Sequence, residues 1–122
     1  MTTLYLVRHG EAMGNILLQF QGNIDCPLTP QGLEQTQCLE KRFAQIPVDV
    51  LYSSPLKRAY DTAAAIARAT GCAIQVDPRL IEINGGEWEG MSWKELPQRY
   101  PEQFDNWVNH PGDFSAPQGE SM

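Results

Sequence analysis

A short apolar run that ends abruptly in polar and charged residues constrains this fold more than any other feature. Residues 4–7 are apolar, and Arg8, His9 and Gly10 follow directly. Such a run predicts a strand buried on both faces of a sheet. Ligands of parallel α/β sheets bind beyond the carboxyl ends of the strands, so we expect Arg8 and His9 at the rim of a crevice. Gly10 has no Cβ and lets the backbone approach a bound group.

These residue types favour one kind of chemistry. A neutral imidazole such as that of His9 is a nucleophile at neutral pH, and an arginine such as Arg8 can hold an oxyanion with two donors. Together they indicate phosphoryl transfer through a phosphohistidine. A single histidine at a strand end is also a common structural residue, so the hypothesis needs support from the rest of the chain.

Strand and helix patterns alternate through the first two thirds of the sequence. Thr29 and Ser54 each precede a proline, the combination that marks an N-cap and the first helical position. The second of these helices is expected to end at Gly71. Strands are expected over residues 48–53 and 73–76. This alternation predicts an α/β fold with a parallel sheet.

The remaining segments are less regular. Residues 11–29 form a polar loop containing Asn15, whose amide could contact a phosphate oxygen or simply shape a turn. Residues 79–83 are expected to be extended. Helices are expected to begin at Ser92, through a capping box, and at Pro101.

Two basic residues occupy an unfavourable place in the second long helix. Lys57 and Arg58 lie in or near its first turn, where the helix dipole is already positive. Helical side chains lean toward the N-terminus, which points Arg58 toward the rim where His9 emerges. A bound anion would relieve the repulsion, whereas the alternative is a solvated pair of cations.

A carboxylate suited to proton transfer lies near a glycine-rich loop. Glu82 precedes this loop, and Glu87 and Glu89 within it are equal candidates for a general acid. His110 lies between helical and Pro-Gly segments and is expected to have no catalytic role.

Composition narrows the possible functions. The 122 residues suffice for one domain, and the net charge of −6 disfavours a nucleic-acid partner. The cysteines, Cys26, Cys38 and Cys72, are too scattered for a disulfide framework or a zinc site. No apolar run reaches membrane length, and we expect a cytoplasmic protein without a membrane partner.

Taken together, these motifs resemble the histidine phosphatase superfamily, also called phosphoglycerate mutase-like. The resemblance covers essentially the whole chain. It implies a three-layer α/β sandwich whose mostly parallel sheet is flanked by helices, and one domain over residues 1–122. The segments that carry it are residues 8–10, Asn15, 27–29, 53–59, Glu82, 86–90 and 117–121.

The resemblance implies a role for each matching residue. His9 is similar to the phosphorylated nucleophile, and Glu82 is similar to the residue that donates and accepts the proton. No metal or cofactor is implied, and the implied partner is a small phosphate ester. The expected phosphate-binding residues are Arg8, Asn15, Gly22 and Arg58.

Two positions depart from the family pattern. Ala12 stands where many members have a threonine. The family also uses a second histidine, followed by glycine, on a C-terminal strand, whereas this sequence has only His9 and His110. We therefore expect residues 1–122 to be the N-terminal portion of a longer protein. Alone, this incomplete domain is expected to be poorly stable and to have little activity.

The leading functional hypothesis is a phosphatase acting on a small-molecule phosphomonoester. Phosphoglycerate mutase-type transfer is the alternative within the family, and Gly14, where mutases often carry tryptophan, favours a phosphatase. The sequence does not distinguish an α-ribazole phosphatase from a sugar-phosphate phosphatase. A non-catalytic phosphate-binding or regulatory module also remains open. A flavodoxin-like nucleotide binder is disfavoured, because residues 11–29 are too long for a compact phosphate loop.

Overall fold

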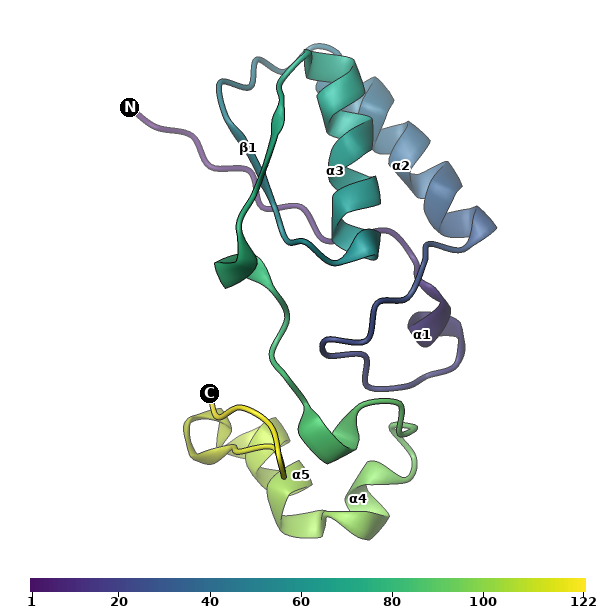
Figure 1. The fold of residues 1–122 in the computed structure, drawn as a ribbon, viewed down its shortest axis with the longest axis vertical. Coiled ribbons are helices and arrows are strands. Elements are labelled where there is room, and N and C mark those ends of the chain that lie inside the picture. The colour runs from purple at the N-terminus through teal and green to yellow at the C-terminus, as the bar shows by residue number, and fades with distance from the viewer.

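Two groups of secondary-structure elements, joined by residues 77–85, make up the chain. The computed structural model describes residues 1–122 (Figure 1). The first group contains helices α1 (Met13–Ile16), α2 (Pro30–Phe43) and α3 (Lys57–Thr70), with strands β1 (Leu51–Ser53) and β2 (Ile74–Val76). None of the helices combines the length and the apolar character needed to cross a membrane.

A parallel two-stranded sheet lies at the centre of the first group. In β1 and β2, Leu51 pairs with Ile74 and Ser53 pairs with Val76, and α3 connects the two strands. Helices α2 and α3 lie together on one side of this pair (Figure 1). Both strands fall inside the segments expected from the sequence, although each is shorter.

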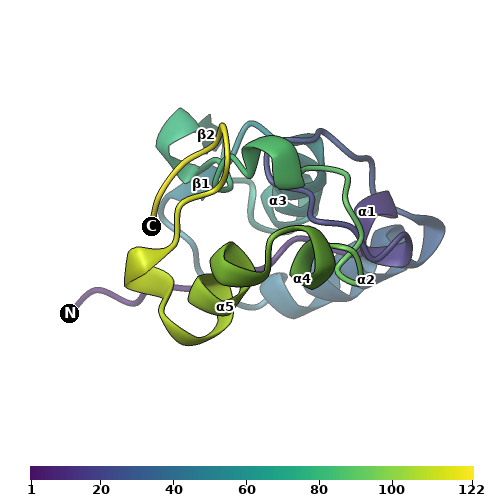
Figure 2. The same ribbon diagram turned by 90° about the horizontal axis from the view of Figure 1, so that it is seen from below.

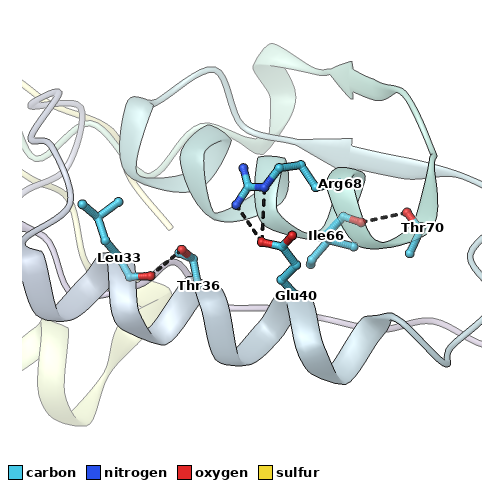
Figure 3. A network of polar contacts seen from close by, with 6 residues as sticks. All are labelled: Leu33, Thr36, Glu40, Ile66, Arg68 and Thr70. Carbon is cyan, nitrogen blue, oxygen red and sulfur yellow. Dashed lines mark hydrogen bonds and ion pairs between the residues drawn. The ribbon is translucent and has the colours of Figure 1, made fainter.

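Helices α2 and α3 pack side by side, and each has one end that the sequence predicts correctly. The Thr29 side chain caps α2 by accepting a hydrogen bond from the Gly32 amide, as predicted. Gly71 ends α3 with a φ of 75°, also as predicted. On the exposed rim, the Arg68 guanidinium bonds the Glu40 carboxylate at 3.0 Å (Figure 3).

The start of α3 differs from the prediction. The helix begins at Lys57, so Ser54 is not its N-cap. A carboxylate from a distant loop does this work, because Asp25 Oδ1 accepts the Lys57 amide at 2.6 Å. Ser54 Oγ instead accepts the Leu56 amide at 3.3 Å.

Residues 4–7 form no strand in this structure, so the expected strand buried on both faces is wrong here. Leu4 and Leu6 are 77% and 88% exposed. A strand needs a neighbour for its ladder, and β1 pairs only with β2. Tyr5 alone packs against a helix, meeting the ring of Phe43 on α2 edge-on.

The second group of elements surrounds a buried tryptophan. Its helices are η2 (Gly86–Trp88), α4 (Leu96–Arg99), α5 (Pro101–Asn109) and η3 (Pro111–Asp113). Residues 11–29, which include α1, are called the first loop. Trp88 is fully buried and packs with Phe20 of the first loop, so this loop belongs to both groups. The other buried members of this core are Leu96, Phe114 and Ala116. Seen from below, α1 lies at the end of the molecule opposite both termini (Figure 2).

Two further expectations for this half need correction. The extended run expected from residue 79 begins later, because the Asp77 side chain caps a short 3₁₀ turn, η1 (Pro78–Leu80), and Ile81 is the first residue after the turn with extended backbone. The Ser92 and Glu95 amides each donate to the other's side chain, as the predicted capping box requires, but helical geometry begins only at Leu96. The expected helix from Pro101 is confirmed.

Candidate functional site

The imidazole of His9 has a defined orientation. The ring is half-buried, and Nδ1 lies 2.7 Å from the carbonyl oxygen of Gly10. A carbonyl oxygen only accepts hydrogen bonds, so in the neutral ring Nδ1 carries the proton. Nε2 then keeps its lone pair, and it is the nitrogen available for attack on an electrophile.

Gly10 brings the backbone of this segment close to α2. A Cβ at Gly10 would lie 2.9 Å from the carbonyl oxygen of Gly32, too close for a side chain. The Gly10 amide donates to Thr62 Oγ1 on α3 at 3.0 Å. His9 is therefore placed by a backbone that both long helices contact.

Arg58 is buried and fully engaged with the first loop. Its side chain is 2% exposed, and the two terminal nitrogens donate to the carbonyl oxygens of Ile24 at 2.7 Å and Gly22 at 2.8 Å. Lys57 beside it is exposed and pairs with Asp61 at 2.8 Å. The two basic residues at the start of α3 therefore differ, because Lys57 forms an exposed ion pair whereas Arg58 is buried against the loop.

Asn15 and Gly22 shape the first loop. Asn15 Oδ1 accepts the Ala12 amide at 2.8 Å, whereas its Nδ2 donates no hydrogen bond within the chain. Gly22 has a φ of 49°, and its carbonyl oxygen accepts from Arg58. Asn15 thus keeps a free donor, while Gly22 acts on Arg58 through its backbone.

The three candidates for the general acid, Glu82, Glu87 and Glu89, differ in their hydrogen-bond partners. Glu87 accepts the Tyr100 hydroxyl at 2.7 Å, and Glu89 Oε1 accepts the amides of Asn23 and Gly85. Glu82 is exposed and bonds only the amide of the residue after it, Ile83. Of the three, only Glu82 lies close enough to His9 to influence its pKa.

The charges around His9 favour its neutral form. Burial lowers the pKa of the imidazole, and the positive charges of Arg58 and Arg8 lower it further. The hydrogen bond to Gly10 and the negative charge of Glu82 raise the pKa, but the net shift is downward. Four of the six predicted site residues therefore share one electrostatic environment.

An open hollow of about 370 Å³ lies between the N-terminal segment and α2. It includes Arg8 and His9, but not Asn15, Gly22, Arg58 or Glu82, so it does not unite the predicted site. The remaining residues around it are Gly10, Gln35, Cys38, Leu39 and Arg42. No three His, Cys, Asp or Glu side chains of the chain gather as metal ligands would.

Sequence reasoning missed three residues that hold the site together. Asp25 caps α3, Thr62 binds the Gly10 amide, and Glu89 joins the first loop to the glycine-rich loop. From the sequence, Glu89 is a candidate only for a general acid. Leu56, the N-cap residue of α3, has no polar side chain. This is the one local feature that indicates a cap from elsewhere in the chain, such as Asp25.

Comparison with known proteins identifies the family. The sequence pattern of the histidine phosphatase superfamily (branch 1) matches residues 4–122. The chain belongs to this superfamily. The family resemblance is thereby confirmed, and so is the expected α/β fold with a parallel sheet flanked by helices, of which this structure has a small, two-stranded sheet.

Individual relatives cover the whole chain but extend beyond it. The chain is 40% identical over 122 residues to phosphoserine phosphatase 1 of Hydrogenobacter thermophilus. It is 40% identical over 126 aligned positions to a protein of Escherichia fergusonii named "Probable phosphoglycerate mutase GpmB". It spans 58% and 57% of their respective lengths.

A solved structure supports the same fold. The mycobacterial glucosyl-3-phosphoglycerate phosphatase complexed with VO3 superposes with a TM-score of 0.84 at 30% identity. The match covers 93% of this chain and 54% of that protein.

Proposed function

We propose that this protein is a phosphatase that hydrolyses a small-molecule phosphomonoester through a phosphohistidine on His9. The observation that carries the proposal is the state of the His9 ring. Nδ1 is engaged by Gly10, Nε2 is free, and burial with two nearby arginines lowers the pKa of the ring. A neutral imidazole beside guanidinium groups is suited to attack on a phosphate dianion.

In the first step, the lone pair of His9 Nε2 forms a bond to phosphorus. The bond between phosphorus and the ester oxygen breaks, and its electron pair goes to that oxygen, which takes a proton from the Glu82 carboxyl group. We propose that Arg8 neutralises charge on the phosphoryl oxygens and that the Asn15 amide, whose Nδ2 donates no hydrogen bond within the chain, donates to one of them. Arg58 contributes its charge while it holds the first loop. Catalysis of this kind is mainly positioning and charge stabilisation.

In the second step, water attacks phosphorus and gives a proton to the Glu82 carboxylate. The bond from Nε2 to phosphorus breaks, and its electron pair returns to the nitrogen. Phosphate leaves, and His9 and Glu82 regain their starting forms. One carboxylate thus acts first as an acid and then as a base.

The relatives support both the reaction class and the ligand. One is a phosphoserine phosphatase, and a structural neighbour is a phosphatase complexed with the oxyanion VO3. We propose small phosphate esters, beginning with phosphoserine, as the partners of this site, and neither nucleic acid nor a membrane. A cytoplasmic location is proposed with it, supported by the free thiols of Cys26, Cys38 and Cys72.

Phosphoenzyme trapping in the full-length protein tests the proposal. Incubation with a panel of labelled phosphomonoesters is expected to give an acid-labile, alkali-stable phosphoprotein and release of phosphate. His9→Ala should abolish both, whereas His110→Asn, which changes the chain's other histidine, should keep both. Absence of labelling and hydrolysis across the panel would overturn the proposal in favour of a phosphate-binding or regulatory module.

A mutase is the second candidate, because one of the 40%-identical relatives is named for that activity. A mutase returns the phosphoryl group to an organic acceptor, whereas a phosphatase passes it to water. Product analysis with 3-phosphoglycerate separates the two: free phosphate supports the phosphatase, and the isomeric phosphoglycerate supports the mutase.

A further inference from the structure

A single buried hydroxyl connects the His9 segment to helix α3. Thr62 is 3% exposed, and its Oγ1 accepts the Gly10 amide at 3.0 Å. The same hydroxyl donates to the carbonyl oxygen of Arg58 at 2.7 Å. Its one proton and one of its lone pairs are therefore both in use.

This contact is the only hydrogen bond between residues 1–10 and the rest of the chain. The other bond in this segment, from His9 Nδ1 to the Gly10 carbonyl, is internal. Residues 4–7 pair with no strand. The Glu11 amide that follows donates to Gln35 Oε1 of α2 at 2.8 Å, so Thr62 is the one hydrogen-bonding partner that holds the His9 backbone to α3.

The hydrogen bond from the Gly10 amide to Thr62 also restricts the orientation of the His9 side chain. The Gly10 amide belongs to the peptide unit that joins His9 to Gly10, so a bond to that amide fixes the peptide plane. The plane in turn sets the direction in which the His9 side chain leaves the backbone. On the other side, the hydroxyl holds the Arg58 carbonyl one helical turn earlier in α3.

We propose that Thr62 is a positioning residue, whose hydroxyl holds His9 Nε2 in line with a phosphoryl group bound beside Arg8 and Arg58. This inference rests on the proposed phosphatase function. Threonine suits the place, because a buried amide left unpaired is costly and only a side chain with an acceptor can satisfy it. Misplacing a reacting group by about 1 Å can cost about 100-fold in rate.

The test compares three variants of the full-length protein. Thr62→Val keeps the shape and removes the hydroxyl, and Thr62→Ser keeps the hydroxyl. Thr36→Val is the matched control, because Thr36 on α2 is also 3% exposed and bonds a carbonyl of its own helix, that of Leu33 (Figure 3). Thr36 forms no hydrogen bond to residues 1–10.

Phosphoenzyme formation is measured in single-turnover experiments. We expect Thr62→Val to slow formation by about 10- to 100-fold, with a smaller change in KM, because a reacting group is misplaced while the arginines remain. Thr62→Ser is expected to recover most of the rate. Thr36→Val is expected to lower thermal stability similarly while keeping the wild-type rate. An equal loss in Thr62→Val and Thr36→Val, or a Thr62→Ser as slow as Thr62→Val, would overturn the positioning role.

A second measurement separates this inference from the proposed function. A wild-type protein that forms no phosphohistidine overturns the phosphatase, and the ¹⁵N spectrum of the His9 ring then decides whether Thr62 orients it. We expect Thr62→Val to change the tautomer balance and the pKa of His9, and Thr36→Val to leave both unchanged. Identical His9 spectra in wild type and Thr62→Val would show that Thr62 does not orient the ring.

Discussion

The imidazole of His9 lies among charges of both signs, and its reactivity depends on their balance. Burial lowers its pKa most, Arg58 and Arg8 lower it further, and the bond to Gly10 and the charge of Glu82 raise it. For a nucleophile the lowering is useful, because the ring then loses its proton at a lower pH than an ordinary histidine. The same carboxylate that opposes the shift is the proposed acid, so removing it affects both proton transfer and the nucleophile.

The pKa of His9 should respond to neighbouring charges with opposite signs. We expect an NMR titration of the full-length protein to give His9 a pKa below its ordinary value. Arg8→Gln removes a positive charge and should raise the pKa, whereas Glu82→Gln removes a negative charge and should lower it further. His9→Asn removes the signal of His9 and so identifies it among the histidine signals. Equal pKa values in all variants would contradict the convergence of these groups.

Arg58 and Arg8 should differ in stability although both are proposed to aid catalysis. Arg58→Met leaves the Gly22 and Ile24 carbonyl oxygens without their donor, and each such loss costs about 1–3 kcal/mol when the group stays buried. Arg8 is exposed and makes no hydrogen bond, so Arg8→Met should change stability by at most about 0.5 kcal/mol.

Urea unfolding with activity assays on the same samples separates these two effects of the arginines. Both variants should lose activity, and only Arg58→Met should unfold at clearly lower urea. An Arg58→Met protein as stable as Arg8→Met would mean that the buried bonds to the loop contribute little.

At the scale of elements, the first loop and helix α3 stabilise each other. Helix α3 has no side-chain cap of its own, and Asp25 supplies one from 32 positions earlier in the chain. Arg58 binds the same loop from the other direction. Arg58 and Gly22, which we propose to bind phosphate, therefore depend on a loop that Asp25 anchors to the start of α3.

Removing this cap should cost both stability and loop order. We expect Asp25→Ala to lower the free energy of unfolding by about 1 kcal/mol, as for other lost N-caps. Asp25→Asn keeps an oxygen acceptor and should lose less. Circular dichroism during urea unfolding measures both. A full loss in Asp25→Asn equal to that in Asp25→Ala would show that charge, not the hydrogen bond, stabilises α3.

Elements with local signals were predictable, whereas elements that depend on distant partners were not. Helix α2 follows from Thr29 and its proline, and the end of α3 follows from Gly71. The start of α3 was misplaced because its cap is remote. Residues 4–7 carry a strand pattern, but a pattern cannot supply the neighbouring strand that makes the ladder.

Some residues of the candidate site were likewise predictable from sequence motifs, and others were not. His9, Arg8, Arg58 and Glu82 stand in recognisable motifs, and the structure brings their charges together. Thr62 and Asp25 stand in no motif that sequence reasoning could use. Their contacts join residues 52 and 32 positions apart, so their roles become visible only once the chain is folded.

At the scale of the whole molecule, the uncovered apolar surface should govern behaviour in solution. Leu4 and Leu6 of the N-terminal segment and Tyr52 of β1 are all more than half exposed. Apolar surface and unpaired strand edges favour association between molecules. A polypeptide of residues 1–122 alone is therefore expected to self-associate at micromolar concentration, bind a hydrophobic dye and show little phosphatase activity.

Sedimentation velocity across a concentration series checks this expectation. Leu4→Lys with Leu6→Lys places charges on the uncovered segment and should reduce association, because both side chains face solvent and their replacement leaves the buried core unchanged. Lys57→Gln, a charge change on an exposed residue of α3, is the control and should leave association unaltered. Monomeric, dye-negative and cooperatively unfolding protein at all concentrations would show that this surface needs no cover.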